Sequence, residues 1–169
     1  MKLCKHYVII LALCFFTAFV FAQSKVLRSP SISIEISMTQ TTIKVGYPIN
    51  VKTVMTNVSS HDVEYSLTNA SPLFEKHVAD QHSGSSAPET GAGRILHSWL
   101  PGHGMKGGSI FSEDRTLLPG KSIETVSDIS KEYDVGQPGK YEVWVEVRDP
   151  EHRDKKVKSN VIVFTVVPQ

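Results

Sequence analysis

Cysteine is nearly absent from this 169-residue sequence, because its only two cysteines, Cys4 and Cys14, lie within residues 1–22. A protein that loses this start has no disulfide, no thiol nucleophile and no thiolate metal site. An excess of charge of one sign is lacking as well, since 18 Lys and Arg stand against 17 Asp and Glu. The formal net charge of +1 therefore gives no electrostatic reason to expect a nucleic acid partner.

Long apolar runs are absent except at the start, and residues 1–22 have the pattern of a secretory signal peptide. Lys2 and Lys5 precede an apolar stretch over residues 7–21, and the small residue Ala22 closes it. A retained transmembrane anchor is the alternative, but the stretch is shorter than the roughly 20 residues that cross a bilayer. We expect cleavage after Ala22, export to the periplasm or the exterior, and no membrane span in the mature protein.

Helix-period patterns are lacking after residue 30, and residues 23–30 are expected to be a linker. Segments that alternate apolar with polar residues, or are rich in β-branched residues, follow instead at short intervals. They cover residues 31–38, 49–58, 63–67, 73–78, 114–118, 123–128, 141–148 and 161–167. Seven to nine such strands over residues 31–168 predict an all-β fold, an antiparallel β-sandwich of immunoglobulin-like type. An up-and-down barrel is the alternative, because alternation alone does not separate the two.

The turn before residues 141–148 supports the sandwich. Tyr141 follows the turn at residues 137–140, with Gly139 two residues before it. A tyrosine in this place is typical of a tyrosine corner, in which the hydroxyl bonds to nearby backbone. The cysteine pair and core tryptophan of antibody domains are missing, so we expect the sandwich architecture and not an antibody-type domain.

Glycine is concentrated in one region, since seven of the eleven glycines lie in residues 80–108. Backbone freedom of this kind is costly to order, so the sequence predicts a long glycine-rich loop excursion there. Residues 94–100 are its one apolar stretch, and we expect them to form a short strand inside the loop.

Several turn and core segments resemble those of a known group of domains. The segments are residues 42–59, 117–121, 133–134, 138–141 and 159–166. With them the chain resembles exported bacterial Ig-like domains of uncharacterised function and, more distantly, proteinase-inhibitor-like Ig domains. The resemblance implies an exported β-sandwich that is often non-catalytic, and it brings no family active-site residue with it.

Candidate chemistry is sparse. His97 and His103 in the glycine-rich excursion raise the hypothesis of a metal site, but no metal-ligand spacing accompanies them, so we expect no metal and no cofactor. No nucleophile elbow of the form Gly-x-Ser-x-Gly occurs, and the adjacent carboxylates Glu113 and Asp114 are expected to be solvated turn charges. The sequence therefore predicts that the protein is not an enzyme.

Binding is the remaining function class. Trp99, His97 and His103 in the excursion are candidate binding residues, as is Trp144, which lies between two glutamates on a predicted strand. We expect an exported, non-catalytic interaction module whose partner is another exported protein or a cell-envelope component. A protease inhibitor or regulator acting through residues 80–108 is the alternative. The sequence leaves the ligand open.

Overall fold

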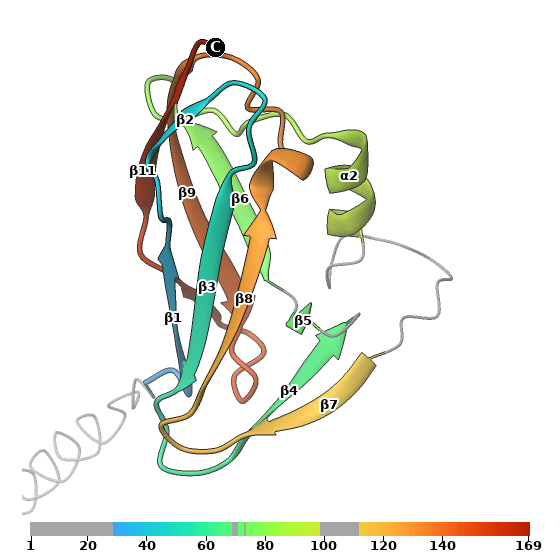
Figure 1. Cartoon of the computed structure of the whole chain (residues 1–169). Coiled ribbons are helices and arrows are strands. Elements are labelled where there is room, and N and C mark those ends of the chain that lie inside the picture. Colours follow the sequence, from blue (N-terminus) through green and yellow to red (C-terminus); the bar gives the residue numbers. More distant parts are fainter. Residues whose placement is uncertain (1–28, 69–70, 73, 99–111) are drawn as a thin grey trace, which may run out of the picture.

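The computed structural model describes residues 29–68, 71–72, 74–98 and 112–169 (Figure 1). The predicted signal peptide, most of the predicted linker, Trp99 and His103 lie outside these residues. Within the described part of the chain, no helix has the length and apolar content needed to cross a membrane.

The protein is an all-β sandwich, as the sequence predicts. The strands are β1 (Ile32–Ser37), β2 (Thr42–Lys44), β3 (Asn50–Asn57), β4 (Val63–Thr68), β5 (Ser71–Pro72), β6 (Glu75–Asp80), β7 (Ser112–Leu117), β8 (Ser122–Asp128), β9 (Gly139–Arg148), β10 (Lys156–Lys158) and β11 (Ile162–Val167). One α-helix, α2 (Gly91–Ser98), and one 3₁₀ turn, η1 (Ile129–Lys131), join them in the described residues. The strands beyond the seven to nine predicted are β2, β5 and β10, each of two or three residues.

Two sheets form the body of the sandwich and a third leans away from it (Figure 1). The first sheet has the order β1-β3-β8. The second has the order β10-β9-β11-β2, and β6 pairs with the opposite edge of β9. The third contains β5, β4 and β7. Every pair is antiparallel except β11 with β2.

The core lies between the first two sheets, and period-two alternation builds it. Ile32 in β1, Val143 and Val145 in β9 and Phe164 in β11 are each at most 1% exposed. Burying a side chain of this size is worth about 1.5–3 kcal/mol. Because neighbouring side chains on a strand point to opposite faces, Trp144 lies on the outer face of the second sheet.

The tyrosine corner is confirmed. The hydroxyl of Tyr141 donates a hydrogen bond of 2.9 Å to the carbonyl of Gln137. Its ring lies 3.6 Å from the position that a Cβ on Gly139 would occupy, and it stacks on Phe164 with ring centroids 5.6 Å apart. This contact ties the turn to the first residues of β9.

The predicted strand over residues 94–100 is wrong where the structure describes it, because residues 91–98 form α2. Thr90 starts the helix: its hydroxyl accepts a bond of 2.9 Å from the amide of Gly93, and its carbonyl accepts the amide of Arg94. The buried positions of α2 are Gly93 and His97. Since neither is apolar, the hydrophobic pattern of the sequence does not reveal a helix.

Residues 149–155 link β9 to β10, which begins at Lys156. Lys158 pairs with Glu146 and Ile162 pairs with Val143, so this edge has one more residue than β9 opposite it. The bulge centres on Ser159, whose hydroxyl accepts a bond of 3.0 Å from the amide of Val145. It sets β10, with Lys156 and Lys158, beside the end of β9.

Candidate functional site

A largely buried network of charged side chains, in which only Glu89 is substantially exposed, holds α2 against η1 and the residues that follow it. His97 lies between two glutamates, with Nδ1 at 2.7 Å from Glu89 Oε1 and Nε2 at 3.3 Å from Glu132 Oε2. Lys76 Nζ donates to the other carboxylate oxygen of Glu132 at 2.7 Å. Tyr133 packs against the His97 ring, with centroids 5.3 Å apart, and its hydroxyl donates to the carbonyl of Lys76. We call these five residues the α2 lock.

The electrostatics of the α2 lock require a charged histidine. Ionised carboxylates only accept hydrogen bonds, so both nitrogens of His97 must carry protons to satisfy Glu132 and Glu89. The bond to Glu132 raises the pKa of His97, with Glu89 adding to it and burial opposing it. Burial alone would raise the pKa of Glu132, but His97 and Lys76 outweigh it and lower that pKa. Both ring nitrogens of His97 are thus engaged in docking the helix.

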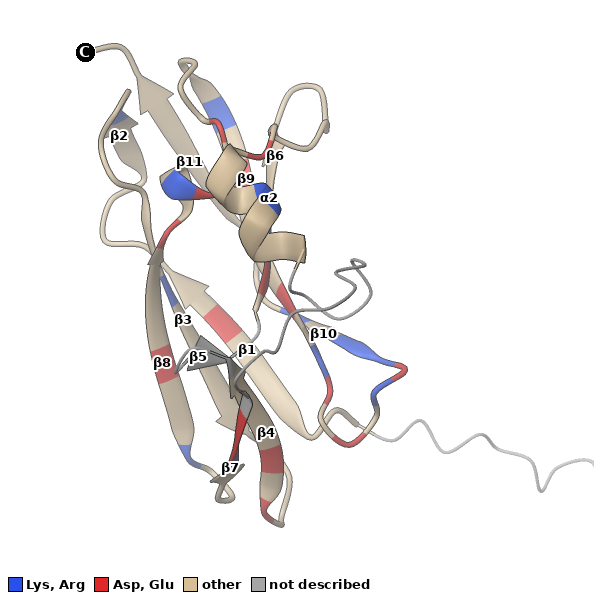
Figure 2. Cartoon of the chain, turned by 90° about the vertical axis from the view of Figure 1, so that its right-hand side faces the viewer, with Lys and Arg blue, Asp and Glu red and all other residues tan. Residues whose placement is uncertain are grey.

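The helix turns its apolar side chains outward. Ile95 is 61% exposed and Leu96 is 46% exposed, while Gly93 and His97 face the protein. A helix that only covers a core has the opposite polarity, with its apolar stripe inward. Figure 2 shows α2 lying across the strands on the side of the molecule that faces the viewer. We call Ile95 and Leu96 the α2 ridge.

Trp144 stands in a layered stack on the outer face of the second sheet. His77 is its partner in register across β6 and β9, and the two rings stack with centroids 5.1 Å apart and planes 10° apart. On the β10 side, the ammonium of Lys158 lies 4.3 Å from the centre of the indole. The indole N–H is buried and has no hydrogen-bond partner among the described residues.

One step along the same strands, two glutamates face the edge of the His77 ring. Glu75 and Glu146 are paired in register, and Lys156 Nζ bonds Glu75 Oε2 at 2.6 Å and Glu146 Oε2 at 3.3 Å. His77 Nε2 lies 3.6 Å from Glu75 Oε1 and 3.7 Å from Glu146 Oε2, too far for hydrogen bonds. This nitrogen is buried and has no hydrogen-bond partner in the part of the chain that the structure describes. Desolvation lowers the pKa of His77 and outweighs the attraction of both glutamates.

These three residues, Glu75, His77 and Glu146, form the outer-face triad, and each has a ligand atom within 4.8 Å of the other two. The sequence reasoning missed the triad. Its only local signal is the spacing of Glu75 and His77, which puts both on one face of a strand. Glu146 comes from far along the chain and joins them only through the register of β6 with β9.

A cleft of about 230 Å³ lies between the triad and the lock, along the edge of β6 that faces away from β9. Glu75 and His77 of the triad line the cleft. It is also lined by Ser86, Ala87 and four residues of the lock, which are Lys76, Glu89, His97 and Tyr133. The cleft therefore joins the base of α2 to the outer face of the second sheet.

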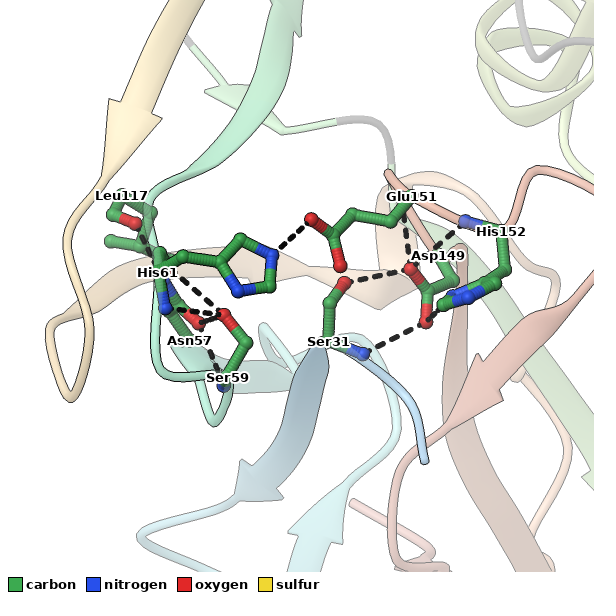
Figure 3. A network of polar contacts seen from close by, with 8 residues as sticks. All are labelled: Ser31, Asn57, Ser59, His61, Leu117, Asp149, Glu151 and His152. Atoms are coloured by element: carbon green, nitrogen blue, oxygen red, sulfur yellow. Dashed lines mark hydrogen bonds and ion pairs between the residues drawn. The ribbon is translucent and has the colours of Figure 1, made fainter. Parts of the chain in front are cut away.

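A separate polar network closes the opposite end of the sandwich (Figure 3). Asp149 is fully buried and accepts hydrogen bonds from the amide of Ser31 at 3.0 Å, from its hydroxyl at 2.7 Å, and from the amides of Glu151 and His152. Burial opposes ionisation, but the Ser31 bonds and the two amides lower the pKa of Asp149. This carboxylate fixes the start of β1 to the turn after β9.

Beside this network lies a cavity of about 470 Å³ lined by Ser29, Ser31, Ser59, Ser60, His61, Glu151 and other residues. His61 Nε2 contacts Glu151 Oε1 at 2.5 Å (Figure 3), and both residues line the cavity. The Ser31 hydroxyl bonds to Asp149 and not to a histidine, so these residues do not have the order of a nucleophile and its base.

The structure separates the candidate binding residues that the sequence singled out. His97 is buried in the α2 lock, 7% exposed, and Trp144 stands on the outer face, where His77 links it to the cleft. Trp99 and His103 lie outside the described residues, so their predicted role stays a prediction.

No family model matches the chain, and no curated protein matches it either. Solved structures similar to it include a β-glucosidase from Listeria innocua (TM-score 0.45, 10% identity, 83% of this chain and 16% of that one). Another is an alkylpurine DNA glycosylase from Pseudomonas fluorescens, with a TM-score of 0.42 and 12% identity over 82% of this chain and 31% of that one. A CARDB domain from Pyrococcus furiosus is similar with a TM-score of 0.40 and 16% identity over 83% of this chain and 89% of that one. This chain thus spans about one sixth of the glucosidase it resembles. Similarity at this level assigns neither a family nor an activity.

Proposed function

We propose that the protein is an exported, non-catalytic binding module, and that it recognises a partner protein through the α2 ridge. The observation that carries the proposal is the reversed polarity of α2. The helix is fastened to the sandwich by a buried charged network, while Ile95 and Leu96 project into solvent. A rigidly docked helix that exposes apolar side chains offers a preformed contact at low entropic cost.

The sequence supports export of the module, and the sheet topology supports a sandwich architecture suited to recognition. Residues 1–22 have the pattern of a signal peptide, which supports the proposal that the protein is exported. The arrangement of β1-β3-β8 opposite β6-β9-β11 follows the A-B-E and C-F-G sheets of constant-type immunoglobulin domains. Domains of this architecture commonly carry recognition at their ends and on loops outside the core.

The test uses full-length mature protein with a photo-crosslinking residue at position 95 or 96, added to the native exported fraction. We expect one protein to crosslink at both positions and not at Val126, an equally exposed valine on β8. Reconstituted with that protein, the variant Ile95→Glu/Leu96→Glu should bind at least about 10-fold more weakly, and Val126→Glu should bind as wild type does. Equal crosslinking at position 126, or unchanged affinity of the double variant, would overturn the proposal.

The inhibitor alternative is decided by the same experiment. The described part of the excursion is held in place, because Gly93 packs on the Glu132 carbonyl and the segment before α2 pairs with β6 through Ser86. If the crosslinked partner is a protease and the protein inhibits it, the module is a regulator of proteolysis. If the partner has no proteolytic activity, the module only binds.

A further inference from the structure

We propose that the outer-face triad of Glu75, His77 and Glu146 binds a divalent transition metal ion of the Zn²⁺ class. This site is independent of the α2 ridge and does not rest on the function proposed above. It adds a metal ion to a chain whose sequence predicts none.

The spacing of the donor atoms fits such an ion. Zn²⁺ binds imidazole nitrogen and carboxylate oxygen at about 2.0–2.2 Å, so tetrahedral ligand atoms lie roughly 3.4 Å apart. His77 Nε2 lies 3.6 Å and 3.7 Å from the nearest oxygens of Glu75 and Glu146. These distances are too long for hydrogen bonds between the groups and close to those that a shared ion imposes.

The nitrogen that faces the carboxylates is itself unsatisfied. His77 Nε2 is buried and has no hydrogen-bond partner among the described residues. A buried polar atom without a partner costs about 1–3 kcal/mol and calls for an explanation. Coordination of an ion between Nε2 and the two carboxylates removes that cost.

The three side chains come from a rigid frame. Glu75 and Glu146 are paired in register on β6 and β9, and His77 is paired with Trp144 in the next rung. The indole stacks on the imidazole with planes 10° apart, which fixes the direction of Nε2. Ligands held on strands and by packing keep their geometry better than ligands on loops.

The donor set selects among metals. One imidazole and two carboxylates suit Zn²⁺ and its neighbours in the first transition row, whereas Ca²⁺ and Mg²⁺ take oxygen ligands throughout. Three protein ligands leave a position for water or for a group of a partner. Glu75 and His77 also line the cleft beside α2, so the ion would lie next to that cleft.

Lys156 is the natural competitor of the ion. Its ammonium bonds both Glu75 Oε2 and Glu146 Oε2, and its side chain is 45% exposed. An exposed lysine of this kind contributes little as a surface ion pair and leaves its partners at small cost. Metal binding is therefore expected to release Lys156, and removal of its charge is expected to strengthen binding.

The experiment titrates chelator-treated mature protein with Zn²⁺ by calorimetry. A Trp99→Phe background leaves Trp144 as the single tryptophan, so quenching by Co²⁺ reports occupancy next to His77. We expect one saturable site that His77→Gln and Glu146→Gln each weaken by about 10-fold or more, and that Lys156→Met tightens several-fold. His61→Gln is the matched control, because His61 also contacts a glutamate but belongs to no triad, and it should leave binding unchanged.

Absence of saturable Zn²⁺ binding up to about 1 mM, in wild type and in Lys156→Met, overturns the proposal. Binding that His61→Gln abolishes and that His77→Gln and Glu146→Gln leave intact overturns it too. Circular dichroism and unfolding of each metal-free variant show whether it is folded. If one of the two triad variants fails to fold, the other still decides the question.

Discussion

His97 and His77 each lie between two glutamates on neighbouring parts of one cleft, and their environments are opposite. His97 is bonded through both nitrogens, at 2.7 Å and 3.3 Å, and its carboxylates raise its pKa. His77 Nε2 lies 3.6 Å and 3.7 Å from its carboxylates and has no hydrogen-bond partner among the described residues, and desolvation lowers the pKa of His77. Histidine and glutamate therefore form a hydrogen-bonded lock in one place and, in our proposal, a metal-ligand set in the other.

The environments of His97 and His77 differ because different groups bond to the carboxylates beside each histidine. In the lock, Glu132 is 7% exposed, and the helix brings His97 to within bonding distance of it. On the outer face, Lys156 bonds both carboxylates, and His77 stacks on the indole with Nε2 3.6 Å and 3.7 Å from them. Hydrogen bonds to the carboxylates therefore raise the pKa of His97, whereas burial without such bonds lowers the pKa of His77.

A third histidine, His152, lies beside the buried carboxylate of Asp149. Substitution of this aspartate is expected to cause the largest loss of stability. His152 Nδ1 lies 3.5 Å from Asp149, and four hydrogen bonds from other groups already satisfy that carboxylate. We expect Asp149→Ala to lower the free energy of unfolding by about 3–5 kcal/mol, because it orphans those donors. Urea unfolding measures this, with Asp154→Ala in the same loop as the control. A loss below about 1 kcal/mol would show that Asp149 does not anchor β1.

The lock itself is broken most directly at Gly93. A Cβ there would stand 2.0 Å from the carbonyl oxygen of Glu132, so Gly93→Ala must push α2 away and separate His97 from Glu132. The expected cost is about 2–3 kcal/mol of docking energy. Hydrogen exchange of residues 91–98 should speed up strongly while β9 keeps its protection. Gly91→Ala, whose Cβ would meet only the end of the Arg94 side chain, is the control. Unchanged exchange in Gly93→Ala would contradict the close approach.

The lock should weaken as pH rises, since the folded-state pKa of His97 is raised. Its stabilisation is complete below the unfolded value of 6.5 and is lost as pH rises through the higher folded value. The pKa of Glu132 is lowered, so its own contribution is present above 4.5 and is lost on acidification. The other titratable groups around the His97 ring are Lys76, Glu89, Tyr133 and His77.

Hydrogen exchange of α2 at pH 5.5 and pH 8.5, corrected for intrinsic rates, should show the helix opening more often at the higher pH, by a factor of about 5–10. His97→Gln should remove that dependence. Equal protection at both values of pH in the wild type would mean that His97 is not charged in the lock.

The smallest effect is expected at His77. Because His77 Nε2 has no hydrogen-bond partner within the described ranges, His77→Gln should change the free energy of unfolding in the absence of metal by less than about 1 kcal/mol. His97→Gln should cost about 2 kcal/mol or more. Thermal unfolding of both variants in chelator measures the contrast. A larger loss for His77→Gln than for His97→Gln would reverse the roles assigned to the two histidines.

Periodicity predicted the strands well because their inward faces are apolar. The buried positions of β1 and β9 alternate as expected, and Tyr141 makes the predicted bond to the Gln137 carbonyl. The helix α2 escaped prediction because its inward residues are Gly93 and His97, which carry no hydrophobic signal. Its capping residue, Thr90, was the one local clue.

The two histidine sites could not be read from the sequence for a different reason. Glu146 reaches His77 through strand register, and Glu132 reaches His97 through docking of a helix on a 3₁₀ turn. Neither relation has a local pattern, and the sequence spacing between the partners is large. Sequence reasoning identified His97 and Trp144 as notable residues but not the partners that determine what they do.

The most direct test of the contrast is a long-range ¹H–¹⁵N correlation spectrum of the histidine rings at pH 7, recorded with and without Zn²⁺. We predict that His97 shows two protonated nitrogens that Zn²⁺ leaves unchanged, and that His77 is neutral and its Nε2 resonance shifts on addition of the ion. A neutral His97, or a His77 resonance that stays in place while Zn²⁺ is added to excess, would contradict the division of the two sites into lock and ligand.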